Sequence, residues 1–139
     1  MDDIDVLHAM RANRDKARGE AGFGPFFKNT SSNVQELFLE VKRFVHALGP
    51  RIETRAMKNG IECCAAGVRF LDIKAQQDAL RLLMVEKITD YADARGLLSQ
   101  TSSTLPVTGV LDRRAQLEDY KRFIQRSYDL CCKRHGAQR

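Results

Sequence analysis

Tryptophan is absent from the 139 residues of this chain, and proline and histidine occur only three times each. The seven phenylalanines and three tyrosines must therefore supply most of the bulky packing in the core. No apolar run approaches the ~20 residues that a membrane-spanning helix needs. The acidic start, Met1 to Asp5, also lacks the basic and apolar regions of a secretory signal. These absences predict a cytoplasmic protein that does not contact a membrane.

Several motifs that accompany catalysis or cofactor binding are also missing. The sequence has no C-x-x-C, no H-E-x-x-H and no phosphate-binding G-x-x-x-x-G-K-[ST] motif. The notable carboxylate pairs, Glu36 with Glu40 and Asp90 with Asp93, have the spacing of solvated helix surfaces. We therefore expect a non-enzymatic protein with no cofactor and no metal centre.

The four cysteines form two adjacent pairs, Cys63-Cys64 and Cys131-Cys132. Neighbouring cysteines bond to each other only with severe strain, and a reducing cytosol disfavours a cross-link between the pairs. We interpret all four as buried free thiols that act as small hydrophobic residues. The alternative is a small enzyme or metal-binding protein that uses Cys131, Cys132 and His135, since Cys131 and His135 are four residues apart. Against it, the C-terminus of a helix disfavours a thiolate.

The length of the chain fits one domain with a core that needs neither metal nor disulfide. We divide it into an N-terminal extension over residues 1–30, a single domain over residues 31–136 and a C-terminal tail over residues 137–139.

The N-terminal extension combines a short charged helix at residues 2–18 with a segment that contains glycine, proline and three phenylalanines. A plain linker would be polar. We therefore predict that this segment docks, either on its own domain or on a second copy in a homodimer. The docking residues are Phe23, Phe26 and Phe27.

Helical periodicity is clearest from Ser32 to Leu48, where apolar residues recur three and four positions apart. Ser32 followed by Gln35 fits a capping box, and Gly49-Pro50 ends the helix. A second amphipathic helix is predicted over residues 113–134, with Asp112 as its cap. Its core stripe consists of Leu117, Tyr120, Phe123, Ile124, Ser127 and Cys131.

Four extended stretches lie between these helices, at residues 51–57, 61–66, 68–74 and 79–86. Short turns join them, including Asn59-Gly60, so they should pair antiparallel. Residues 88–100 read as a short helix or irregular connection, leading into a polar loop at 99–104. Residues 105–111 are expected to form a last strand, which Pro106 would place at an edge. The prediction is a two-layer α+β domain, with an antiparallel meander sheet of four to five strands packed by two amphipathic helices.

Residues 34–130 resemble the bacterial family catalogued as domain of unknown function 5655. The resemblance rests on Val34 to Phe38, Arg43 to Val45, Leu48 to Pro50, Lys58, Ile61, Phe70, Ile73, Leu80 to Leu82, Phe123, Ile124, Ser127 and Tyr128. It implies a compact α+β module, often appended to predicted restriction nucleases or other defence proteins. It implies no catalytic residues.

Positive charge is concentrated at the C-terminal end of the chain. Residues 113–139 carry eight basic and three acidic side chains, whereas the rest of the chain is balanced. The plainest interpretation of such a stripe is a solvated face; the alternatives are that it binds the phosphate groups of nucleic acid or an acidic protein partner. The candidate contact residues, opposite the predicted core stripe, are Arg114, Lys121, Arg122, Arg126 and Lys133.

Overall fold

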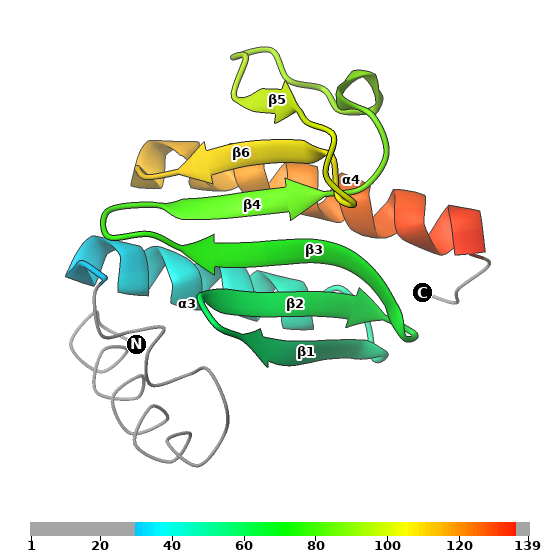
Figure 1. Ribbon diagram of the computed structural model, residues 1–139, viewed down its shortest axis with the longest axis horizontal. Helices are drawn as coiled ribbons and strands as arrows, with labels where there is room; N and C mark the ends of the chain where they lie inside the picture. The colour runs from blue at the N-terminus through cyan, green and yellow to red at the C-terminus, as the bar shows by residue number, and fades with distance from the viewer. Residues whose placement is uncertain (1–29, 136–139) are drawn as a thin grey trace.

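A computed structural model describes residues 30–135, which form a six-stranded antiparallel sheet and two long helices. Both helices, α3 and α4, lie behind the sheet in Figure 1, against the same face. The strand order is β1-β2-β3-β4-β6-β5. This arrangement confirms the predicted α+β class and the antiparallel sheet packed by two helices, although six strands exceed the predicted four to five.

Helix α3 spans Ser32–His46 and buries Val34, Leu37, Phe38, Val41 and Val45, as its apolar spacing predicts. The predicted cap at Ser32 is wrong by one residue. The hydroxyl of Ser31 accepts a hydrogen bond from the backbone N–H of Val34 at 3.3 Å, because Ser31 keeps the extended backbone that a capping residue needs.

Strands β1 (Ile52–Met57), β2 (Gly60–Ala65), β3 (Val68–Ala75) and β4 (Leu80–Met84) form the predicted meander. The turn between β1 and β2 is Lys58-Asn59, so Gly60 already belongs to β2. The turn between β2 and β3 is Ala66-Gly67, and both residues have positive φ, at 51° and 82°. Two such residues produce the twist that a two-residue hairpin requires.

The region after β4 departs from the sequence-based prediction. It contains a 3₁₀ turn at Ile88–Asp90 and a short strand, β5, at Leu98–Gln100. Strand β6 (Val107–Leu111) lies between β4 and β5, so its predicted place at an edge is wrong. Pro106 precedes β6 and therefore removes no donor from the ladder; its carbonyl accepts the backbone N–H of Thr101 at 2.7 Å.

Helix α4 spans Leu117–His135 and follows a 3₁₀ turn at Arg114–Gln116. All residues of the predicted core stripe are buried. The predicted cap at Asp112 is wrong by one residue: Arg113 is the N-cap of the 3₁₀ turn that leads into α4, and the side-chain oxygen of Gln116 accepts its backbone N–H at 3.3 Å. Neither described helix is long and apolar enough to cross a membrane.

A β-bulge decides which side chains of β3 face the helices. Cys63 pairs with Leu71 and Cys64 with Arg69, so Phe70 is an extra residue on β3. Phe70 and Leu71 therefore both point toward the helices, where the ring centres of Phe70 and Tyr128 lie 5.5 Å apart. The bulge turns Arg69 and Asp72 to the other face of the sheet, which we call the open face.

Candidate functional site

The cations predicted on the last helix lie along α4 and the turn before it. Arg114, Arg122, Arg126 and Lys133 are exposed, whereas Lys121 is half-buried. The difference arises because α3 packs beside α4: the ammonium of Lys121 lies 6.0 Å from the centre of the Phe44 ring. The helical wheel could not reveal this neighbour.

Three of these cations have partners within the chain. The ammonium of Lys121 lies 3.4 Å from a carboxylate oxygen of Glu118, and Arg122 forms an ion pair with Asp119. The Nε of Arg126 donates to the carbonyl of Asp90 at 2.9 Å, which ties α4 to the connection after β4. Arg114 and Lys133 have no carboxylate within 4 Å among residues 30–135, so they keep the most available charge.

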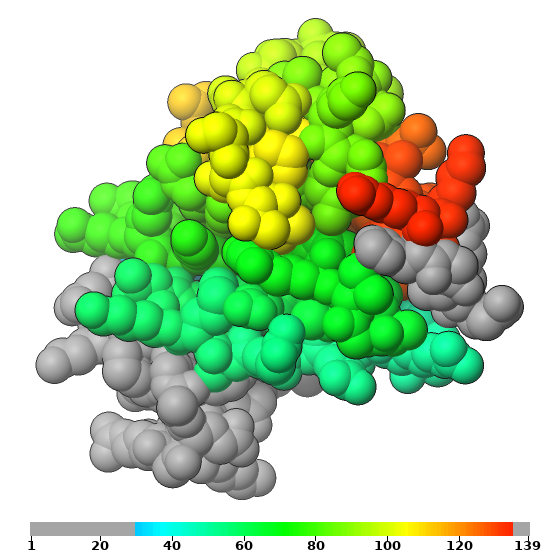
Figure 2. All heavy atoms as spheres, turned by 45° about the vertical axis from the view of Figure 1, so that its right-hand side comes forward, coloured from blue at the N-terminus to red at the C-terminus, as the bar shows by residue number. Residues whose placement is uncertain are grey.

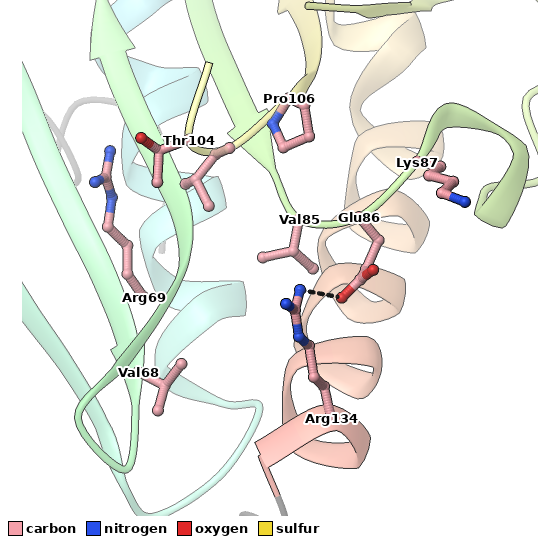
Figure 3. A pocket seen from close by; sticks show the side chains of 9 residues that line it. Val68, Arg69, Val85, Glu86, Lys87, Thr104, Pro106 and Arg134 are labelled. Carbon is pink, nitrogen blue, oxygen red and sulfur yellow. Dashed lines mark hydrogen bonds and ion pairs between the residues drawn. The ribbon is translucent and has the colours of Figure 1, made fainter. Parts of the chain in front are cut away.

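A cleft of about 490 Å³ opens beside the C-terminal end of α4. In Figure 3, Val68 and Arg69 stand on one side of it, and Val85, Glu86 and Arg134 on the other. The loop before β6 closes the upper part with Thr104 and Pro106, and Leu105 of the same loop also lines the cleft. Figure 2 shows this loop, in yellow, standing out from the surface, with the red end of α4 to its right.

The cleft exists because β3 and β4 separate there. Beyond Met84 the chain turns away at Glu86, whose φ of 73° is unusual for a residue other than glycine. The buried Ser127 of α4 fills the gap: its hydroxyl accepts the backbone N–H of Val85 at 3.1 Å and donates to the carbonyl of Phe70 at 2.7 Å. The hydroxyl of Tyr91 donates to the carbonyl of Val85 at 2.7 Å. Side-chain hydrogen bonds thus take the place of the backbone hydrogen bonds that β3 and β4 no longer make to each other there.

The charges around the cleft are mostly paired. Arg134 contacts a carboxylate oxygen of Glu86 at 2.8 Å. Arg69 holds the buried Asp72 through two hydrogen bonds, one of 2.7 Å from its Nε, and this bonding raises the pKa of the guanidinium. The cleft is therefore a recess with apolar walls and a rim of mostly paired charges, to which Lys87 adds a further exposed cation.

Sequence reasoning found the helix cations and missed the cleft. Lys133 and Arg134 are adjacent, and the charge excess of residues 113–139 includes both. Nothing local marks Arg69 or Glu86, because the cleft depends on where β4 leaves the sheet.

The cysteines do not form a reactive group in the part of the chain that the structure describes. All four are free and buried, which confirms the expectation of buried thiols. Cys131 is 3.9 Å from the carbonyl of Val68, and burial raises the pKa of its thiol to about 11. Burial likewise raises the pKa of Cys63 far above its usual value.

Metal ligands do not gather either. Among the side chains that the structure describes, no three His, Cys, Asp or Glu residues are placed to hold a metal ion. The side chain of His135 lies outside the described residues, as does the predicted docking segment with Phe23, Phe26 and Phe27.

We expect the thiols of the native protein to react with Ellman's reagent at neutral pH far more slowly than those of the unfolded chain. Raising the pKa of a thiol from 9 to about 11 lowers its thiolate fraction at pH 7 about a hundredfold, in addition to the steric effect of burial. Stopped-flow absorbance with and without denaturant measures the ratio. A native thiol that reacts as fast as free cysteine would contradict this and would favour the alternative enzyme.

No protein-family model, curated protein or solved structure matches the chain.

Proposed function

We propose that this chain is a non-enzymatic interaction module that binds an anionic macromolecule, nucleic acid or an acidic protein, through the exposed surface of α4. One observation carries the proposal: the positive charge in excess over the whole chain lies in residues 113–139, and four of the five candidate cations there are exposed. Cations on one helix side suit a phosphate backbone because each neutralised phosphate releases a condensed counterion.

The surroundings of α4 support the same proposal. Arg126 bonds to the connection after β4, and Lys87 of that connection lies at the rim of the cleft. Arg134, in the last turn of α4, also lines the cleft, so we expect a partner bound along α4 to reach this recess with one of its groups. The resemblance to domain of unknown function 5655 further suggests that the protein works in the bacterial cytoplasm, in a defence or nucleic-acid-associated system.

Duplex DNA is the probe for this proposal. Four exposed cations contact at most about four phosphates, so the slope of log K against log salt should be no steeper than about −4. The double variant Arg114→Gln/Lys133→Gln removes two cations that have no partner in the described chain. We expect it to flatten the slope by about one to two and to leave the melting temperature unchanged. Fluorescence anisotropy over a salt series measures both the affinity and the slope.

The matched control is Arg51→Gln/Lys58→Gln, which removes the same charge from exposed positions before β1 and in the β1–β2 turn. It should leave the slope unaltered. Equal losses in the two double variants would show that only net charge matters. Undetectable binding of DNA at low salt would remove nucleic acid and leave an acidic protein as the partner of α4.

A further inference from the structure

Strand register places two cations next to each other on the open face of the sheet. Gly60 pairs with Lys74, Lys74 with Arg81, and Arg81 with Val110. Met57 pairs with Gly60, so the row runs across five strands, from β1 to β6. We call these five residues the basic row. Paired residues of an antiparallel ladder point to the same face, so all its side chains share the open face.

Lys74 and Arg81 form a like-charge pair, which a sheet ordinarily avoids. Directly opposite residues have Cβ atoms about 5 Å apart, close enough for repulsion. Neither cation has a carboxylate within 4 Å in the described part of the chain. The acids of the next row are already engaged: Glu62 with Arg55 at 3.4 Å, and Asp72 with Arg69. The positive charge of the basic row is therefore available to another molecule.

The side chains that flank the two cations are apolar. Val110, next to Arg81, is the most exposed of the large hydrophobic side chains that the structure describes, at 37%. Met57 is half-buried at the other end. Gly60 has no side chain, and its neighbours leave no space for one, since an added Cβ would lie 1.9 Å from the carbonyl oxygen of Ile73. The buried backbone at Gly60 is therefore closed to a ligand, which would instead meet the side chains of Met57, Lys74, Arg81 and Val110.

We propose that the basic row binds an acidic polypeptide segment, with carboxylates on Lys74 and Arg81 and an apolar side chain against Val110. Lys74 and Arg81 can each contact a carboxylate, and Val110 and Met57 on either side can contact apolar residues between the carboxylates. A single-stranded nucleic acid would need bases stacked on aromatic side chains, and the described strands place no aromatic residue on this face. The proposal concerns the face opposite α4 and stands apart from the function proposed for that helix.

The test uses a labelled peptide of repeated Glu-Glu-Leu units, a matched peptide of Glu-Glu-Ser units and a thymidine oligonucleotide of equal charge. We expect the full chain to prefer the Glu-Glu-Leu peptide at low ionic strength. Lys74→Gln/Arg81→Gln should weaken its binding about tenfold, because the charge contacts of the exposed Lys74 and the half-buried Arg81 are both lost. Val110→Thr should remove the preference for leucine over serine. Fluorescence anisotropy gives each affinity.

The control variant is Arg114→Gln/Lys133→Gln, with the same change of charge on the opposite side. It should leave peptide binding unchanged, just as Lys74→Gln/Arg81→Gln should leave the DNA binding of α4 unchanged. Arg81→Glu separates the effect on affinity from the effect on folding. It creates an opposite-charge pair with Lys74, so its melting temperature should be no lower than that of the native chain. It should nevertheless bind the Glu-Glu-Leu peptide more weakly than any other variant. Equal loss in both double variants would overturn the proposal. The proposal would also be overturned if the chain bound the oligonucleotide more tightly than the peptide and lost that binding in Lys74→Gln/Arg81→Gln. The basic row would then be a nucleic-acid surface.

Discussion

Gly60→Ala is expected to destabilise the fold by about 3 kcal/mol or more, a large part of the stability of a small domain. Its new Cβ would lie 1.9 Å from the Ile73 carbonyl oxygen and 2.9 Å from the Cα of Lys74. Both are backbone atoms, which cannot move aside as a flexible side chain does. The substitution must therefore push β2 away from β3 next to the basic row.

Chemical denaturation followed by circular dichroism measures this loss. Gly67→Ala is the matched control in the following hairpin turn, where an added Cβ meets nothing within 4 Å but φ is 82°. The left-handed backbone alone should cost about 1 kcal/mol there. Equal losses at the two positions would contradict the close approach at Gly60.

Ser127→Ala is expected to cost about 2–4 kcal/mol, although it removes a single oxygen atom. The change leaves the N–H of Val85 and the carbonyl of Phe70 without their partner in a buried region. Since Ser127 joins α4 to both strands at the cleft, amide exchange at Val85 should also accelerate. Denaturation and hydrogen-exchange NMR measure the two effects.

Ser102→Ala, at an exposed serine in the loop before β6, is the control and should change stability by less than about 0.5 kcal/mol. Tyr91→Phe probes the same network from the other side, because it removes only the donor to the carbonyl of Val85. A Ser127→Ala variant as stable as the native chain would show that the hydroxyl does not bridge the strands.

The sequence by itself determined the elements whose signals are local. Apolar spacing located α3 and the buried stripe of α4, and alternation with tight turns located β1 to β4. The charge count identified α4 as the segment with the surplus of cations. These inferences succeeded because a helix or a hairpin depends on residues close together in the chain.

Pairing between distant segments was decided only by the tertiary structure. Strand β5 has three residues, too few for an alternation pattern, and it forms only because it pairs with β6. Strand β6 therefore has a neighbouring strand on each side, β4 and β5. The half-burial of Lys121 requires α3 as a neighbour. Likewise, a bulge at Phe70 turns Asp72 and Lys74 to the open face, where register sets Lys74 opposite Arg81. Such contacts join residues far apart in the chain, and their free energy appears only when the whole sheet has formed.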